Sequence, residues 1–132
     1  MSEPVQPIWI DERDAIALHD RLLALDGGPA GVRDEGLLKS ALARPQQLLA
    51  YGDAPEIVDL ATAYTTGIIR NHPFIDGNKR TGFVVGVLFL EMNGARLTAS
   101  EEDATQAVLG LAAGTLDESA FAVWLRANVN IH

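Results

Sequence analysis

The chain contains no cysteine, which excludes disulfide bonds and thiol catalysis. It also lacks a long apolar run, because the longest, FVVGVLFL at residues 83–90, is far shorter than the roughly 20 residues of a membrane helix. The N-terminal stretch MSEPVQPIWIDERD does not combine a basic start with an apolar segment, as a signal peptide would. We therefore expect a soluble cytoplasmic protein without membrane contact.

Basic residues are scarce compared with acidic ones. Lys and Arg total 10 and Asp and Glu total 18, which gives a net charge of -8. Proteins that bind nucleic acid usually present a basic face, so this balance argues against direct nucleic-acid binding but not against a local anion site. The 48% hydrophobic content is enough for a core, and we expect a single domain over residues 1–132.

Most of the chain has helical patterning. The expected fold is all-α: a compact bundle of about six helices with at most a minor short β element. Short polar residues suited to N-caps predict four of the helix starts, at Asp11, Asp34, Ser100 and Asp117. We expect the second of these helices to stop before Pro45, because proline disfavours helical backbone at the preceding residue.

The helices in the middle of the chain are predicted from further local signals. Pro55 suits the first turn of a helix that continues to residue 71. The next helix, from about residue 79 to 92, is apolar nearly all round and should be central and buried. Gly82 and Gly86 lie one turn apart on it and predict close approach of a neighbouring helix. Residues 5–10 and 95–99 are either short edge strands or extended chain.

The segment NHPFIDGNKRTG, residues 71–82, concentrates polar side chains between two apolar helices. Asn78 stands at the start of the second helix, and we expect it to be the N-cap. A helix start presents unpaired N–H groups and partial positive charge, to which Lys79 and Arg80 add two formal charges. Cations at this end oppose the helix dipole, as is expected of a functional site. The pattern predicts an anion cradle, most naturally for phosphates.

Three other residues of the segment complete a possible reaction centre. Asp76 is a lone carboxylate beside the cations and suits Mg²⁺ shared with phosphate oxygens. His72 can take a proton near neutral pH, and Phe74 is expected to anchor the loop in the core. The functional interpretations of the charged and titratable residues have structural alternatives. His72 could be a helix C-cap, Asp76 a turn residue, and Lys79 and Arg80 a solvated first turn. Together they favour phosphoryl or nucleotidyl transfer.

These residues resemble the signature of the Fic/Doc family, H-P-F-x-[D/E]-G-N-[G/K]-R-x-x-R, which stands here as HPFIDGNKRTGF at residues 72–83. Residues 18–19, 31–45, 51–52 and 89–97 are also similar to the Doc (death-on-curing) toxin branch. We interpret His19 as a residue of a helix face rather than a catalytic group. Residues 31–45 could dock a partner or simply pack as a helix.

The resemblance implies a specific reaction. Lys79 stands where AMP-transferring members have glycine, and Phe83 stands where they have a second arginine. In the Doc branch, ATP sits reversed, and its γ-phosphate is delivered to a protein hydroxyl of elongation factor Tu, which inhibits translation. Carried over by position, His72 would be the base and Asp76 would hold Mg²⁺. The phosphates would be bound by Gly77, Asn78, Lys79 and Arg80.

The resemblance also implies a protein inhibitor. Self-inhibited Fic proteins carry the motif [S/T]-x-x-x-E-[G/N]; here only Glu35 precedes Gly or Asn, and the residue four before it is Gly31. Inhibition would then come from a small antitoxin whose C-terminal segment folds onto this chain. The alternatives are AMP transfer to a protein hydroxyl and a non-catalytic role in an antitoxin–toxin repressor complex. The acidic balance disfavours a nuclease toxin.

Overall fold

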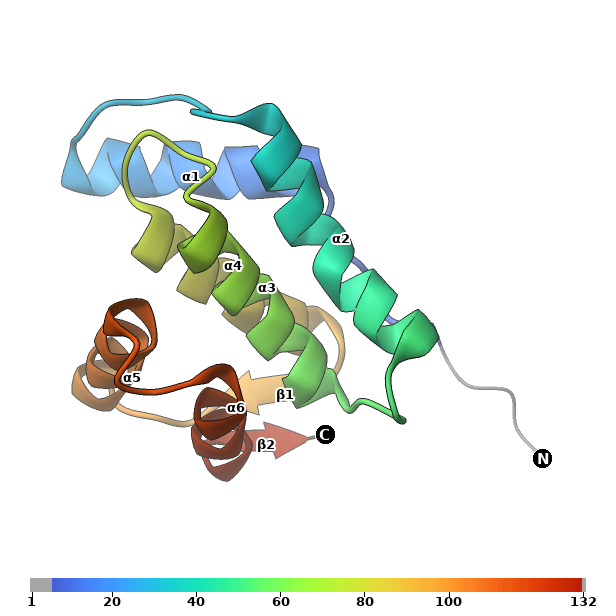
Figure 1. Ribbon diagram of the computed structural model, residues 1–132. Coiled ribbons are helices and arrows are strands. Elements are labelled where there is room, and N and C mark those ends of the chain that lie inside the picture. Colours follow the sequence, from blue (N-terminus) through green and yellow to red (C-terminus); the bar gives the residue numbers. More distant parts are fainter. Residues whose placement is uncertain (1–5, 132) are drawn as a thin grey trace.

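A computed structural model describes residues 6–131 and contains six helices and one two-stranded sheet (Figure 1). The prediction of an all-α bundle with a minor β element is therefore confirmed. The elements are α1 (Glu12–Asp26), α2 (Glu35–Tyr51), α3 (Ile57–Asn71), α4 (Asn78–Met92), β1 (Ala95–Leu97), α5 (Glu101–Ala113), α6 (Glu118–Ala127) and β2 (Val129–Ile131). Within residues 6–131, no helix is both long and apolar enough to cross a membrane.

The centre of the bundle is α3, in which every residue from 60 to 69 is buried. Helices α2 and α4 pack along it, and α5 and α6 contact it from the C-terminal part of the chain (Figure 1). The expectation that α4 would be central and buried is confirmed in part: no residue from 81 to 90 is exposed, but α5 covers the outer side of α4 only in part. That side keeps four half-buried residues, Phe83, Val84, Val87 and Leu88.

The contact between α3 and α4 depends on two glycines. A Cβ atom added to Gly82 would lie 3.1 Å from the carbonyl oxygen of Thr65, and one added to Gly86 would lie 3.1 Å from that of Ala61. The Thr65 hydroxyl also donates a hydrogen bond to the Gly82 carbonyl at 2.8 Å. The predicted close approach is confirmed, and it locks together the two helices that flank residues 72–77.

The predicted N-caps are all present. Asp11, Asp34, Ser100 and Asp117 each accept a hydrogen bond from the backbone N–H three residues later. In α1 the bond is part of a reciprocal capping box, and the N–H of Asp14 lowers the pKa of the Asp11 carboxyl. These helix starts follow from local chemistry alone.

Both proline predictions are wrong. Pro45 lies inside α2, which continues to Tyr51, and Pro55 precedes Glu56, the N-cap of α3. A proline within a helix loses one backbone hydrogen bond and costs about 3 kcal/mol. Here Pro45 is itself buried, and Leu48 and Leu49 beyond it pack against the core, so burial offsets that cost.

Only one of the two segments expected to be strand or extended chain forms a strand, and its partner strand was not predicted. β1 falls within residues 95–99 and pairs antiparallel with β2, which has no alternating pattern to reveal it. Residues 6–10 form neither strand nor helix, and Val5 lies outside the described residues.

The segment before α1 is hydrogen-bonded to α3 through the backbone of Ile10. The Ile10 N–H donates to the Tyr64 hydroxyl at 2.9 Å, and this hydroxyl donates to the Ile10 carbonyl at 3.2 Å. Burial raises the pKa of Tyr64 to about 12. This tie sets where α1 begins, and α1 supplies one wall of the site described next.

Candidate functional site

The signature loop, residues 72–77, connects α3 to α4. Its first residue, His72, is the C-cap of α3 and adopts the left-handed conformation, with φ 52° and ψ 52°. The His72 N–H donates to the Ile68 carbonyl at 3.1 Å, while its side chain is exposed. The expected structural role as a helix cap is therefore carried by the backbone, which leaves the imidazole available for other contacts.

Asn78 is not the N-cap of α4, contrary to expectation. Gly77, with φ +77°, takes that position, and the Asn78 side chain turns back into the loop. Its Oδ1 accepts from the Phe74 N–H at 2.9 Å, and its Nδ2 donates to the Phe74 carbonyl at 2.9 Å and to His72 Nδ1 at 3.1 Å. Asn78 is thus a buried brace within the loop, and the backbone of Phe74 fixes which way its amide faces.

The orientation of the Asn78 amide also determines the state of the His72 ring. Because Nδ2 of Asn78 is a donor, His72 Nδ1 accepts and holds a lone pair. The neutral imidazole in this arrangement carries its proton on Nε2.

Phe74 anchors the loop in the core, as predicted, and its partner is a residue of α1. The Phe74 ring is fully buried and stacks on the His19 ring, with centroids 4.0 Å apart and planes at 7°. His19 is 1% exposed, and its Nε2 donates to the Asp76 carbonyl at 2.7 Å. The interpretation of His19 as a simple helix-face residue missed this role. Its spacing of four from Ala15, the other buried residue of α1, was the available signal.

Asp76 is exposed and directs one carboxylate oxygen away from the loop. Oδ1 accepts from the Gly77 N–H at 2.9 Å, while a Cβ atom added to Gly28 would lie 3.1 Å from Oδ2. Within residues 6–131, no group of three or more His, Asp or Glu side chains could hold a metal ion alone. A single carboxylate with an accessible oxygen fits Mg²⁺ that takes its other ligands from phosphates and water.

The segment before α2 braces the signature loop from outside. Arg33 donates to the carbonyl of His72 through Nε at 2.7 Å and to that of Asn71 through Nη2 at 3.0 Å. The backbone N–H groups of Arg33 and Asp34 donate to the Pro73 carbonyl at 2.7 and 3.1 Å. These contacts support structural packing, rather than partner docking, for the start of residues 31–45.

The two cations at the start of α4 have different surroundings. Arg80 forms an ion pair with Asp26, the last residue of α1. Each charge stands at the unfavourable end of its own helix dipole, and the pair compensates both. Lys79 has no ion pair among the described residues and is exposed. The violation of the dipole rule therefore has a structural explanation at Arg80 but not at Lys79.

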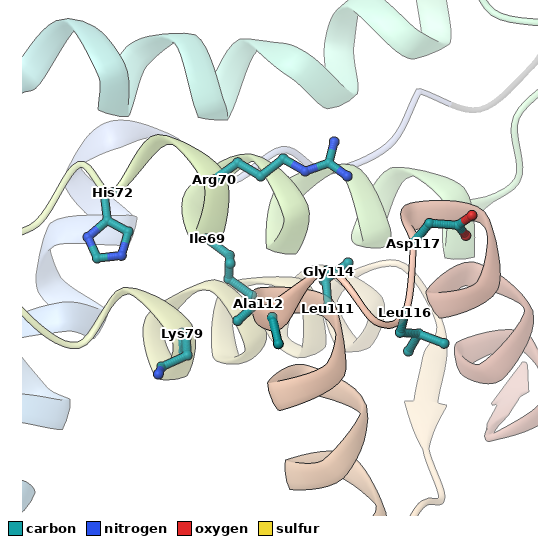
Figure 2. A pocket seen from close by; sticks show the side chains of 10 residues that line it. Ile69, Arg70, His72, Lys79, Leu111, Ala112, Gly114, Leu116 and Asp117 are labelled. Carbon is teal, nitrogen blue, oxygen red and sulfur yellow. The ribbon is translucent and has the colours of Figure 1, made fainter.

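Lys79 borders two clefts. The polar cleft, of about 470 Å³, runs between the α3–α4 junction and the turn from α5 to α6 (Figure 2). Figure 2 shows His72 and Lys79 at one end of it and Leu116 and Asp117 at the other. Sequence reasoning did not identify Arg70, which lines this cleft beside His72. The residues of the polar cleft are Ile69, Arg70, His72, Lys79, Leu111, Ala112, Ala113, Gly114, Leu116 and Asp117.

The apolar cleft, of about 510 Å³, lies on the other side of Lys79, between α4 and α5. It is lined by Lys79, Arg80, Phe83, Val84, Leu97, Ala99, Ser100, Glu101, Ala104, Thr105, Val108 and Leu109. Lys79 lines both clefts, whereas His72 lines only the polar one.

The chain is similar in sequence to a known protein family and to individual known proteins. The profile of the Fic/DOC family matches residues 9–90, which include α1, α2, α3 and the signature loop. Over 117 residues, the chain is 34% identical to "Protein kinase doc" of Escherichia phage P1, an alignment that covers 89% of this chain and 92% of that protein. Over 74 residues, it is 46% identical to "Toxin Doc" of Mycolicibacterium smegmatis, covering 55% and 57% of the two chains.

Proposed function

Because the chain belongs to the Fic/DOC family, we propose that it is the toxin of a toxin–antitoxin module and transfers the γ-phosphate of ATP to a protein hydroxyl. Two relatives support this proposal by their names, one a protein kinase and the other a toxin. The observation that carries it is Lys79, an exposed cation at the start of α4 between the two clefts. The first backbone N–H groups of a helix point to the same place, so the position suits phosphate.

The proposed binding site uses the residues around Lys79. The start of α4, at Gly77, Asn78 and Lys79, would hold phosphate oxygens, and Asp76 would hold Mg²⁺. When bound, Mg²⁺ would neutralise charge on the phosphates and orient them. Arg80 would contribute to binding only after leaving Asp26.

The proposed reaction is an in-line displacement at the γ-phosphorus. The oxygen of the target hydroxyl bonds to phosphorus, the bond to the oxygen bridging the β- and γ-phosphates breaks, and ADP leaves with the electron pair. The hydroxyl proton goes to His72. Because the lone pair of the neutral ring is on Nδ1, taking this proton requires the hydrogen bond from Asn78 to open. His72 and Asn78 therefore act as a unit in the proton transfer.

The family resemblance supplies the proposed partners. We take elongation factor Tu in the cytoplasm as the target and an antitoxin, acting through its C-terminal segment, as the inhibitor. The name of one relative, "Toxin Doc", supports the toxin role on which this inhibitor depends.

The test is transfer of radioactive label from ATP to purified elongation factor Tu in the presence of Mg²⁺. The expected result is labelling from γ-labelled ATP, no labelling from α-labelled ATP, and loss of labelling in His72→Ala and Asp76→Ala. Asp53→Ala, an exposed carboxylate in the loop before α3, is the matched control and should label as wild type. Labelling only from the α position would instead establish AMP transfer. Toxicity retained in His72→Ala would favour a non-catalytic binding protein.

A further inference from the structure

We infer that the apolar cleft between α4 and α5 is the binding site for the base of the nucleotide, an inference that rests on the proposed function. The cleft combines a volume of about 510 Å³ with walls from three elements. Phe83 and Val84 come from α4, Leu97 from β1, and Val108 and Leu109 from α5. Sites for small molecules are usually apolar clefts of about 300–1,000 Å³ with a few polar groups, and this one has that character.

The apolar cleft is also lined by five polar residues, two from α4 and three from the start of α5 and the residue before it. Lys79 and Arg80 border it where it meets the start of α4. Two hydroxyls of α5 are already occupied: Ser100 accepts from the Asp103 N–H at 3.1 Å, and Thr105 donates to the Glu101 carbonyl at 2.9 Å. The Glu101 carboxylate has no ion-pair partner among the described residues, so it offers an acceptor for an exocyclic amino group.

The order of the residues determines which phosphate meets His72. Of these two clefts, Phe83 lines the apolar one but not the polar one, His72 lines the polar one but not the apolar one, and Lys79 lines both. A nucleotide with its base against Phe83 therefore extends its phosphates past Lys79 toward His72. The γ-phosphate is the end of that chain and comes nearest to His72. The apolar cleft thus gives a geometric reason for transfer of the γ-phosphate rather than of AMP.

The same placement gives Phe83 a role. An aromatic side chain is suited to contact with the flat face of a base and is not suited to binding phosphate. Phe83 replaces the second arginine of the signature, so its presence is consistent with a base, rather than a phosphate, on this side of Lys79. The polar cleft, with Arg70, His72 and Asp117, is then left for the target segment that carries the hydroxyl.

Two exposed residues of α5 allow the cleft to be changed without disturbing the core. Thr105 and Leu109 lie one helical turn apart, and both line the cleft. Thr105→Trp fills the cleft with a large side chain, and Leu109→Asp places a charge on its wall. The matched control is Val123→Trp, an exposed position on α6 that lines neither cleft.

The experiment measures dissociation constants by calorimetry with Mg²⁺ present, for ATP and for inorganic tripolyphosphate, which has no base. The wild type should bind ATP at least about tenfold more tightly than tripolyphosphate, which corresponds to about 1.4 kcal/mol. Thr105→Trp and Leu109→Asp should lose this difference and keep the affinity for tripolyphosphate. Val123→Trp should match the wild type, and the KM for ATP in the transfer assay should rise only in the two cleft variants.

Each failure has its own pattern. If the wild type binds ATP and transfers its γ-phosphate, and both cleft variants do so with unchanged constants, the base lies elsewhere while the proposed function stands. If the cleft variants retain ATP affinity but escape neutralisation by the antitoxin, the cleft is a protein-docking groove and the inference is wrong. If the wild type binds neither ATP nor tripolyphosphate, the proposed function fails together with the base site.

Discussion

The signature loop has two unlike sides. The closed side faces α1 and the segment before α2, where His19, Gly28 and Arg33 contact the loop and Asp26 binds Arg80. The open side faces α5 and α6, where the polar and apolar clefts meet at Lys79. The groups that fix the loop thus come from the N-terminal part of the chain, while the groups around the clefts come partly from the C-terminal part.

The two neighbouring cations at the start of α4, Lys79 and Arg80, differ in how they are held. Both line the apolar cleft, but Arg80 is tied to α1 by its ion pair with Asp26, whereas Lys79 has no ion pair among the described residues. Fixing a loop from behind keeps its reactive face available, because the contacts that hold it do not compete with a ligand. Variants of the two sides should therefore fail in different ways: open-side variants in transfer, and closed-side variants in stability, with an effect on transfer only where they displace Asp76.

The largest expected effect is on the open side. Lys79→Ala should lower kcat/KM for phosphate transfer by about 10²- to 10³-fold, because it removes a charge aimed at the transferring phosphates. Its free energy of unfolding should change little, since Lys79 has no ion pair among the described residues. Steady-state transfer and urea unfolding measure the two quantities. Lys39→Ala, an exposed lysine of α2, is the control, and equal activity of both variants would contradict the assignment of an open side.

On the closed side, His19→Leu should lower the free energy of unfolding by about 1–3 kcal/mol. The change removes the hydrogen bond to the Asp76 carbonyl and the stacking on Phe74, each worth about 1 kcal/mol. Denaturant unfolding gives the stability, and a Mg²⁺ titration of transfer shows whether Asp76 has shifted. Arg21→Gln, an exposed residue of the same helix, should leave both unchanged. A fully stable His19→Leu protein would show that the loop does not depend on α1.

A smaller effect is expected where the segment before α2 passes Asp76. Gly28→Ala should destabilise by about 1–2 kcal/mol and raise the Mg²⁺ concentration needed for half-maximal transfer. The glycine has φ +114°, and a Cβ there would lie 3.1 Å from Asp76 Oδ2. Gly27→Ala is a matched control, because Gly27 also has positive φ while its added Cβ would meet nothing within 4 Å. The same Mg²⁺ dependence in both variants would assign the effect to the backbone alone.

The smallest effect is expected for the ion pair between Asp26 and Arg80. Asp26→Asn should lower the free energy of unfolding by less than about 1 kcal/mol and leave transfer unchanged, because exposed ion pairs contribute little. Thermal unfolding at low and high salt measures the stability, with Asp20→Asn as the exposed control on the same helix. Transfer that rises several-fold would mean that Asp26 competes with phosphate for Arg80, so that Arg80 binds the ligand as well as α1.

The parts of the fold that sequence patterns predicted are those decided locally. The caps at Asp11 and Ser100, and the close approach at Gly82, follow from residue type and spacing. Pro45 was misjudged because its local cost is offset by burial against distant residues, which no local pattern records. β2 was missed because its pairing with β1 is a contact across the chain.

In the candidate site, too, the features decided by local sequence could be predicted and those decided by distant contacts could not. The signature segment could be identified because its residues are contiguous, and Phe74 could be placed in the core because it is a large apolar residue in a short loop. The true position of Asn78 depends on the backbone of Phe74. His19 and Asp26, the partners of Asp76 and Arg80, each lie more than 50 positions from the residue they contact. The clefts could not be foreseen, since they depend on how α5 is oriented against α4.

The close packing of α3 on α4 has a mechanical consequence. With the carbonyls of Ala61 and Thr65 set against Gly86 and Gly82, neither helix can slide or tilt without a steric clash. His72 and Lys79 stand at the ends of these two helices and should keep a constant separation through thermal motion. Opening and closing around a ligand is then left to the less tightly packed α5 and to the turn before α6.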